Sequence, residues 1–179
     1  MRSRSLTLAP EKTEAVFITG RRRHTPINIE VEGVSVQTRS DLKYLGVRID
    51  SGLNYGAHLT AVAAKASKTV AALSRLMPNI GGPRGSKRKL LSSVAHSVML
   101  YSAEIWREAL NKERHHNKLK KVQRKIALRI YGTYRNTSVE AVMVVAGIIP
   151  IKLQVEERNT IYNRQRYERD IRKGPEKTP

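Results

Sequence analysis

The sequence predicts an α+β fold in which a short antiparallel β segment precedes an α-helical bundle. Residues 13–50 contain apolar runs with the period of two that is typical of strands. From residue 59 onward the apolar residues recur at intervals of three and four, as on one face of a helix. Hydrophobic residues make up 40% of the 179 positions, which is enough for a packed core. No apolar run approaches the roughly 18 residues that span a bilayer, so we expect no membrane helix.

Three strands are expected in the first part of the chain. Residues 13–19, TEAVFIT, form a continuous apolar run that is typical of a buried strand. Residues 27–31 and 34–37 alternate between apolar and polar side chains. The Glu-Gly pair at 32–33 joins these two runs, and this arrangement predicts a β-hairpin.

Residues 42–49, LKYLGVRI, are expected to form the last strand, with Gly46 in its middle. A glycine inside a strand marks a bulge, or a place where another backbone or a ligand comes close. Three or four strands need a partner that covers their apolar face, and nothing before residue 13 supplies one. We therefore expect that the N-terminal part of this domain is missing from the chain.

Four or five helices are expected after a turn-rich link at 51–58. The first helix should end within 77–85, where two prolines and three glycines occur. Its shared apolar face consists of Leu59, Val62, Ala66, Val70, Leu73 and Met77. The second helix is expected over about 85–110, with these residues in line: Leu91, Val94, Val98, Tyr101, Ile105 and Ala109. The third is expected over about 112–131, with these residues inward: Leu119, Val122, Ile126 and Ile130.

Capping signals place the remaining helices. Gly132 is expected to end the third helix, because glycine readily adopts the left-handed conformation found at helix C-termini. Thr137 or Ser138 can cap a short fourth helix that has Glu140 in its first turn. A fifth, mostly polar helix is expected over about 151–172.

The net charge is the strongest functional signal. The chain has 34 Lys and Arg against 15 Asp and Glu, a formal net charge of +19. A compact chain this basic indicates a polyanionic partner, with nucleic acid as the first candidate and an anionic membrane as the second. A structural, ribosome-like RNA-binding role is the simplest alternative. The chain has no cysteine, which excludes disulfides and thiolate metal sites.

Basic residues gather in two of the expected helices. The start of the second helix carries Arg84, Lys87, Arg88 and Lys89. The third helix carries Lys112, Arg114, Lys118, Lys120, Lys121, Arg124, Lys125 and Arg129. Because these eight cations face a single Glu and repel each other, phosphate binding is favoured over a merely solvated face. Tyr131, Tyr134 and Trp106 are candidates for stacking on bases or sugars, although Trp106 lies next to the apolar face and is expected in the core.

The sequence offers no complete catalytic or metal site. A two-metal site needs neighbouring carboxylates, and the three aspartates, Asp41, Asp50 and Asp170, are not adjacent. Asp41 and Asp50 flank a strand and are expected to cap turns. His115 and His116 do not share a helix face and have no carboxylate cluster near them in sequence, so we expect no metal site there.

Two stretches resemble conserved motifs of the reverse transcriptases of non-LTR (LINE-type) retrotransposons. Residues 8–22, LAPEKTEAVFITGRR, followed by residues 42–50, LKYLGVRID, resemble the end of the palm domain. Within them, residues 8–16, LAPEKTEAV, resemble the fourth conserved polymerase motif, and residues 43–47, KYLGV, resemble the fifth motif, the primer grip. Residues 101–106, YSAEIW, and 146–151, AGIIPI, are similar to what arthropod elements carry after the palm. The resemblance covers nearly the whole chain.

The resemblance implies a division into three parts. Residues 1–52 would be the end of the palm with a primer-grip hairpin, residues 53–135 a helical thumb, and residues 136–179 post-thumb helices with a charged tail.

The resemblance also implies site residues at the primer grip and near the leaving group. Tyr44, Leu45 and Gly46 would shape the contact with the 3′ end of the primer, where a glycine lets two backbones meet. Lys12 matches the lysine of the fourth motif, which approaches the leaving pyrophosphate and stabilises its charge. A solvated lysine before a strand is the alternative for Lys12.

The parent protein would be an RNA-directed DNA polymerase that uses Mg²⁺ and deoxynucleotides. Its metal-binding aspartates would lie in the missing N-terminal palm, next to the fingers. This chain is therefore expected to hold no cofactor, to be inactive alone, to bind RNA–DNA hybrid or duplex without sequence preference, and to be intracellular, either cytoplasmic or nuclear. The expected backbone contacts are Arg84, Lys87, Arg88, Lys89, Lys118, Lys120, Lys121, Arg124 and Lys125.

Two alternatives remain open. The chain is either such a fragment or a free-standing basic module that binds RNA or DNA without enzymatic activity. A decayed element without a present role has the same sequence features as the fragment.

Overall fold

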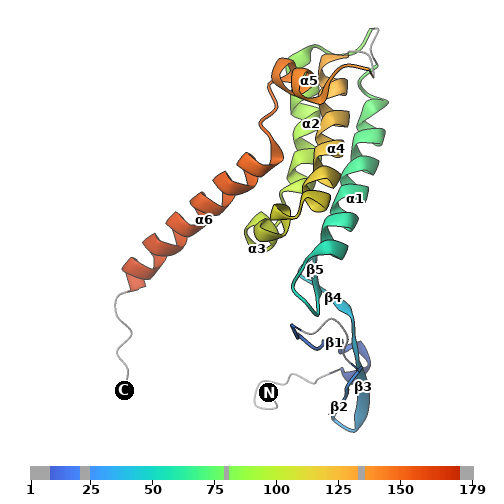
Figure 1. Cartoon of the computed structure of the whole chain (residues 1–179), viewed down its shortest axis with the longest axis vertical. Coiled ribbons are helices and arrows are strands. Elements are labelled where there is room, and N and C mark those ends of the chain that lie inside the picture. The colour runs from blue at the N-terminus through green and yellow to red at the C-terminus, as the bar shows by residue number, and fades with distance from the viewer. Residues whose placement is uncertain (1–8, 21–24, 79–80, 133–135, 174–179) are drawn as a thin grey trace. The chain divides into compact units, whose positions relative to one another are not determined.

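The computed structural model describes residues 9–20, 25–78, 81–132 and 136–173 (Figure 1). The chain forms two compact units, Met1–His58 and Leu59–Pro179. The predicted α+β class is confirmed, since small sheets in the first unit precede a series of helices.

A three-stranded sheet begins the first unit. After the 3₁₀ turn η2, Pro10–Lys12, the strands are β1, Ala15–Val16; β2, Asn28–Val31; and β3, Val34–Arg39. The order is β1-β3-β2, with β1 parallel and β2 antiparallel to β3. The hairpin predicted over 27–37 is confirmed, and its central residues Glu32 (φ 46°) and Gly33 (φ 79°) both have the positive φ of a type I′ turn.

The predicted buried strand over 13–19 is wrong in length and burial. Val16 pairs with Arg39, the last residue of β3, so residues after Val16 have no residue of β3 left to pair with. Phe17 and Ile18, which follow β1, are exposed. An apolar run indicates burial only where a neighbouring strand or helix extends far enough to cover it.

A second hairpin replaces the single strand predicted over 42–49. Strands β4, Asp41–Tyr44, and β5, Val47–Asp50, pair antiparallel, and Tyr44 lies opposite Val47. The turn between them consists of Leu45 (φ 46°) and Gly46 (φ 86°). Gly46 is therefore neither a bulge nor an interruption of a strand: it supplies the second positive φ of a two-residue turn.

The base of this hairpin is tied to the start of helix α1, Gly56–Ser74. The Asp50 carboxylate accepts hydrogen bonds from the backbone N–H of Asn54 and Tyr55, which confirms it as a turn cap. Asp41 instead forms an ion pair with Arg48 on the opposite strand. The backbone N–H of Arg48 donates to His58 Nδ1 over 3.3 Å.

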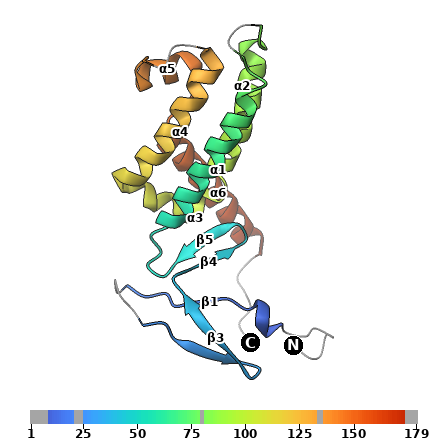
Figure 2. The same ribbon diagram turned by 90° about the vertical axis from the view of Figure 1, so that its right-hand side faces the viewer.

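Three long helices form the body of the second unit: α1, α2, Gly85–Met99, and α4, Glu113–Tyr131. Their ribbons run alongside one another in both views (Figure 1 and Figure 2). The faces predicted for the first and third helices are confirmed, although Leu73 is only half-buried. These faces bury the following residues: Leu59, Val62, Ala66, Val70, Met77, Leu119, Val122, Ile126 and Ile130.

The continuous second helix predicted over 85–110 is wrong. The chain leaves the helix after Met99, and Ser102 adopts a left-handed conformation (φ 51°). The short helix α3, Ala103–Trp106, and the 3₁₀ segment η3, Arg107–Asn111, follow.

The predicted face of this helix is also wrong. Its buried residues are Arg88, Ser92, Ala95 and Met99, whereas Val94, Tyr101 and Ile105 are exposed, Leu91 and Val98 are half-buried, and only Ala109 of the predicted set is buried. The break buries Trp106 completely, and its Nε1–H donates to the carbonyl oxygen of Tyr101 over 3.0 Å. The burial of Trp106 with its N–H hydrogen-bonded stabilises the fold more than the burial of the smaller apolar residues on the predicted helix face would.

The last two helices follow the predicted signals. Gly132 (φ 74°) ends α4, and the Ser138 hydroxyl accepts a hydrogen bond from Ala141 N–H at the start of α5, Val139–Ala146. Helix α6, Ile151–Lys173, buries Ile151 and Val155 against the bundle, while its second half is exposed. None of the described helices is long and apolar enough to cross a membrane.

A buried guanidinium joins the ends of three helices. Arg88 is 7% exposed, and its side chain donates to the backbone carbonyls of Met77, Pro78, Pro83 and Arg129 at 2.5–3.5 Å. Carbonyls at helix C-termini lack intrahelical partners and carry partial negative charge. The cation therefore satisfies acceptors at the ends of α1 and α4 from its place on α2.

We predict that Arg88→Met lowers the free energy of unfolding by about 2–3 kcal/mol, because it leaves several buried carbonyls without a donor. Arg88→Lys should recover only part of this, since an ammonium lacks the planar fork of five N–H donors. The exposed neighbour variant Lys87→Met serves as the control and should change stability by less than about 0.5 kcal/mol. Urea denaturation measures all three, and equal values for the variants of Arg88 and Lys87 would contradict the role of the buried cation.

The buried histidines predict a pH dependence of stability. Burial is the main cause that lowers the pKa of His58, His96 and His115. Unfolded histidine has a pKa of about 6.5 and binds protons more readily than these folded histidines. The stabilisation is therefore complete above about pH 6.5 and is lost as the pH falls from there towards the folded pKa values.

The urea midpoint should accordingly be flat from about pH 7 to 8 and fall towards pH 5.5. In the variant His115→Asn this fall should be smaller, because one of the titrating rings is gone while an amide N–H can replace His115 Nδ1, which lies 2.9 Å from the carbonyl oxygen of Ala109. An unchanged slope in that variant would count against His115 as a contributor.

Candidate nucleic-acid interface

The tip of the β4–β5 hairpin presents apolar side chains to solvent. Leu45 is 75% exposed and Tyr44 is also exposed. Leu45 has a left-handed backbone, which costs a residue with a Cβ roughly 1–2 kcal/mol and which Asn or Gly would adopt more easily. Leu45 thus combines an exposed apolar side chain with a strained backbone, a combination that makes the tip a candidate contact surface.

Cations flank this tip. Lys43 and Arg48 are exposed and lie directly opposite each other in the ladder. Like charges in this position repel, and Arg48 forms an ion pair with Asp41 over 3.4 Å. A phosphate group would relieve the repulsion, so the hairpin combines an apolar tip with a positive stem.

Lys12 ends the η2 turn with an exposed side chain. Its backbone N–H donates to the carbonyl oxygen of Ala9. Across the described ranges, no three or more His, Cys, Asp or Glu residues form a group that could hold a metal ion. Of the adjacent histidines of α4, His115 is buried and His116 is half-buried.

One face of α4 carries a straight row of exposed cations, which we call the α4 basic stripe: Arg114, Lys118, Lys121 and Lys125. Their spacing of four, three and four residues keeps them within about 60° on a helix of 3.6 residues per turn. The buried residues of α4 lie on a different face, so the stripe is presented to solvent. Lys118, Lys121 and Lys125 belong to the predicted contacts, whereas Arg114 is predicted only as one of the basic residues of the helix.

Other predicted contacts are engaged with the protein itself. Lys120 pairs with Glu140 over 3.0 Å, and this hydrogen bond is the main cause that lowers the pKa of Glu140. Arg124 donates to the carbonyl oxygen of Thr137 over 2.9 Å. Arg88 is almost fully buried and its guanidinium donates to four backbone carbonyls, an arrangement that does not favour the phosphate contact predicted for it. The side chain faces inward because carbonyl oxygens at the ends of α1 and α4 have no partner within their own helices and accept its N–H groups.

The start of α2 does not gather its cations on one face. Arg84 is the N-cap, and Lys87 and Lys89 are exposed but lie on different sides of the helix, two residues apart. Lys89 turns towards Gly147, where a Cβ would lie only 2.8 Å from Lys89 Nζ. Of the aromatic candidates, Tyr131 is exposed, Trp106 is in the core, and Tyr134 lies outside the described residues.

Helix α1 lies beside the stripe with small side chains. Lys118 Nζ donates to Thr60 Oγ1 over 2.7 Å, which fixes the neighbouring face of α1. Residues 60, 64, 67 and 71 continue that face as Thr, Ala, Ser and Ala, and all are exposed or half-buried. The row of cations therefore borders a low face of α1, that is, a helix face on which these side chains are small.

The chain is distantly similar to Pol polyproteins of R1 retrotransposable elements from insects. It is 26% identical over 175 residues to the Pol polyprotein of type-1 element R1 2 from Nasonia vitripennis, a match that covers 94% of this chain and 41% of that protein. The match to the R1 4 polyprotein of the same species has 30% identity and covers 72% of this chain and 33% of that protein. The R1 polyprotein of Bradysia coprophila is 24% identical, with 84% of this chain and 15% of that protein covered.

The chain thus spans less than half the length of these relatives. No protein-family model and no solved structure matches it. The expectation of a relation to non-LTR retrotransposon proteins is confirmed at the level of distant homology to R1 Pol polyproteins.

The strain at the hairpin tip gives a testable prediction. Leu45→Asn should raise the free energy of unfolding of the hairpin unit by about 0.5–1 kcal/mol, because Asn tolerates the left-handed conformation. Gly46→Ala should lower it by about 1 kcal/mol for the opposite reason. Thermal melts followed by circular dichroism compare both variants with the parent chain. A stabilising Gly46→Ala would show that the turn does not have the described geometry.

Proposed function

We propose that this chain is the end of the palm and the thumb of a retrotransposon reverse transcriptase, and that it binds a template–primer duplex. The palm end would comprise residues 1–52, the thumb residues 53–135, and the post-thumb segment residues 136–179. The α4 basic stripe is the observation that carries the proposal: four aligned, exposed cations beside a low face of α1 match the spaced phosphates of a nucleic-acid backbone. The relation to R1 Pol polyproteins supports the same assignment.

The stripe would act without reading sequence. Lysine and arginine contacts to phosphate position a protein on a duplex, whereas sequence is read at base edges. Each neutralised phosphate releases counterions, so the logarithm of the binding constant falls with the logarithm of salt concentration by about 0.9 per contact. Four stripe cations therefore contribute a slope of about −3 to −4.

The hairpin would hold the end of one strand. The side chains of Tyr44 and Leu45 offer apolar contact to sugars, and Gly46 leaves the backbone of the turn open to a second backbone. Lys43 and Arg48 would meet the adjacent phosphates. This use explains why the turn tolerates a strained leucine instead of the asparagine that hairpin turns favour.

Catalysis would belong to the whole polymerase rather than to this chain. The proposed parent uses Mg²⁺ held by aspartates that this chain does not carry as a pair. Lys12 is the candidate within the chain that would stabilise charge on the leaving pyrophosphate when those aspartates are supplied. The proposed activity of the chain itself is binding.

A free-standing basic RNA- or DNA-binding module is the second candidate. The helical unit favours it, because Leu59–Pro179 is a compact unit with its own buried core. Both candidates bind polyanions; they differ in whether the hairpin tip contributes. Replacement of Leu45 by Asn should weaken binding to a recessed primer end only if the tip acts as a primer grip.

The test replaces the stripe residues Arg114, Lys118, Lys121 and Lys125 by Gln. Binding to an RNA–DNA hybrid, measured by fluorescence anisotropy from about 50 to 200 mM salt, should weaken at least tenfold at the lowest salt, and the salt slope should become shallower by about 3. The control replaces four exposed cations of α6, Lys152, Arg164, Arg166 and Arg169, by Gln, which removes the same charge.

The control should retain most of the affinity. Equal losses in the two quadruple variants would mean that net charge alone drives binding, which would contradict an interface at the stripe.

A further inference from the structure

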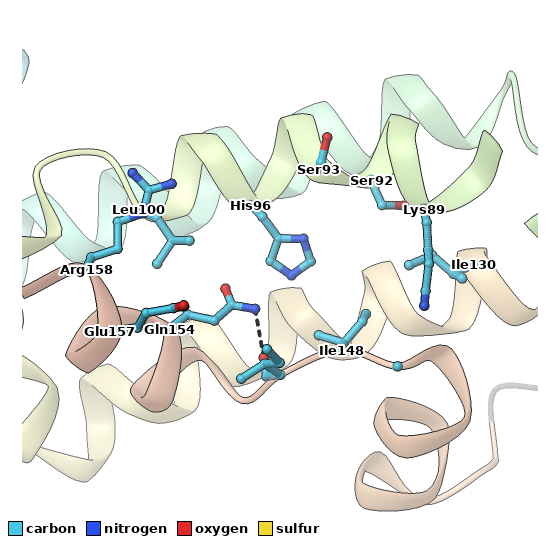
Figure 3. A pocket seen from close by; sticks show the side chains of 12 residues that line it. Lys89, Ser92, Ser93, His96, Leu100, Ile130, Ile148, Gln154, Glu157 and Arg158 are labelled. Atoms are coloured by element: carbon cyan, nitrogen blue, oxygen red, sulfur yellow. Dashed lines mark hydrogen bonds between the residues drawn. The ribbon is translucent and has the colours of Figure 1, made fainter. Parts of the chain in front are cut away.

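A solvent-open cavity of about 410 Å³ lies in the helical unit (Figure 3). Its walls come from α2, from the first turns of α6, and from the segment 147–149 that joins α5 to α6, with Ile130 of α4 also lining it. Small-molecule sites typically enclose about 300–1,000 Å³. The cavity is thus large enough for a small ligand, and none of the residues used above as hairpin or stripe contacts lines it.

Two buried atoms in this cavity lack hydrogen-bond partners among the described residues: Nε2 of His96 and Oε1 of Gln154. Figure 3 shows the His96 ring pointing from α2 into the space that Gln154 borders on the other side. The amide nitrogen of Gln154 already donates to the carbonyl oxygen of Ile149 over 2.9 Å, so its oxygen is the end left over. Buried polar atoms without partners are rare in folded proteins and call for an explanation.

Both atoms are acceptors. Burial is the main cause that lowers the pKa of His96, so the ring is neutral at pH 7, and a hydrogen bond with the Ser92 backbone partly opposes that shift. The hydrogen bond to the Ser92 backbone needs a proton on the ring, because a backbone carbonyl oxygen can only accept. Nε2 has no partner, so Nδ1 is the nitrogen that carries this proton and donates to Ser92. The neutral ring then presents the lone pair of Nε2 to the cavity.

The cavity also carries positive charge at its edges. Lys89 lines it and lies over Gly147, and Arg158 lines it from α6. Neither cation has an ion pair with a described carboxylate, although Glu157 also lines the cavity. The hydroxyls of Ser92 and Ser93 add polar groups, while Leu100 and Ile148 provide an apolar surface. A ligand that fits must bring hydrogen-bond donors for the two acceptors, a flat apolar body, and a negative group.

We propose that this cavity binds a single nucleotide whose base carries an exocyclic amino group, with guanine preferred and the phosphate held by Lys89. Guanine has two adjacent N–H groups on one edge, which can serve His96 and Gln154 together. Uracil and thymine have no amino group and carry one ring N–H between two carbonyl oxygens, so they can serve only one of the two acceptors. Enzymes and binding modules that take up unstacked bases use this combination of edge hydrogen bonds and apolar contact. The inference rests on the proposed function in one respect: the nucleotide would belong to the nucleic acid that the chain holds.

The test titrates the full chain with GMP, AMP, CMP and UMP, using calorimetry for affinity and ¹H–¹⁵N spectra for the location. GMP should bind at least about tenfold more tightly than UMP, because UMP leaves a buried acceptor unpaired. The signals of the His96 ring and the Gln154 side chain should shift with GMP.

Gln154→Met should reduce the preference for GMP over UMP towards one. This variant should fold, because the carbonyl oxygen of Ile149 keeps a second donor, Nε2 of Gln123, at 3.0 Å. His96→Phe, which keeps the ring volume, should have the same effect. Lys89→Gln should weaken all four nucleotides by a similar factor, and the matched variant Lys152→Gln, also on an exposed lysine but outside the cavity, should change none of them.

Equal affinity for the four nucleotides, no binding of any of them, or an unchanged GMP preference in Gln154→Met would overturn the inference. The salt titration of hybrid binding distinguishes a failure of the cavity assignment from a failure of the proposed function. If the stripe variants lose hybrid binding as expected but the nucleotides are not discriminated, only the cavity assignment fails. If hybrid binding does not depend on the stripe either, the proposed function fails as well.

Discussion

The arrangement of the long helices depends on the buried guanidinium of Arg88. Its donors reach the carbonyl oxygens of Met77, Pro78 and Pro83 and that of Arg129 near the end of α4, so a single side chain of α2 links the end of α1 to the end of α4. Gly82 makes the arrangement possible, because a Cβ there would collide with the carbonyl oxygen of Pro78 and lie 2.6 Å from Arg88 Nη2. A charge buried in this way is tolerated because its five N–H groups find acceptors at helix ends.

Two glutamines perform a related task at the other side of α4. Gln123 is buried and bonds with both its amide ends: it donates to the carbonyl oxygen of Ile149 and accepts from the N–H of Ile151. Gln154 donates to the same carbonyl. The segment that leads into α6 is thereby held against α4 without regular secondary structure, and the cavity beside His96 results from this placement. Polar side chains thus set the geometry that the apolar core alone leaves undefined.

Periodicity predicted the parts of the fold in which apolar contact decides the structure. The faces of α1 and α4, the Gly132 stop and the Ser138 cap all followed from residue type and spacing. The hairpin at 41–50 was missed because residues 42–49 resemble one continuous strand, and the Leu-Gly turn lacks the Asn or Asp that marks type I′ turns. The dipeptide Leu45-Gly46 contained the only available signal.

The remaining errors concern long-range competition, which a pattern of neighbours does not contain. Helix α2 stops where Trp106 can be buried with its N–H paired, and Arg88 faces inward because two distant helix ends need a donor. The candidate interface was predicted in part. Net charge and the density of lysines indicated α4, but only the structure separates the cations that point outward from Lys120 and Arg124, which hold the start of α5.

At the base of the β4–β5 hairpin one carboxylate holds two neighbouring parts of the first unit. Asp50 ends β5 and at the same time accepts hydrogen bonds from the N–H groups of Asn54 and Tyr55, while His58 accepts from the backbone N–H of Arg48 in the same strand. Loss of the Asp50 carboxylate would therefore loosen the end of the strand and the turn at residues 54–55 together, because both depend on the same side chain.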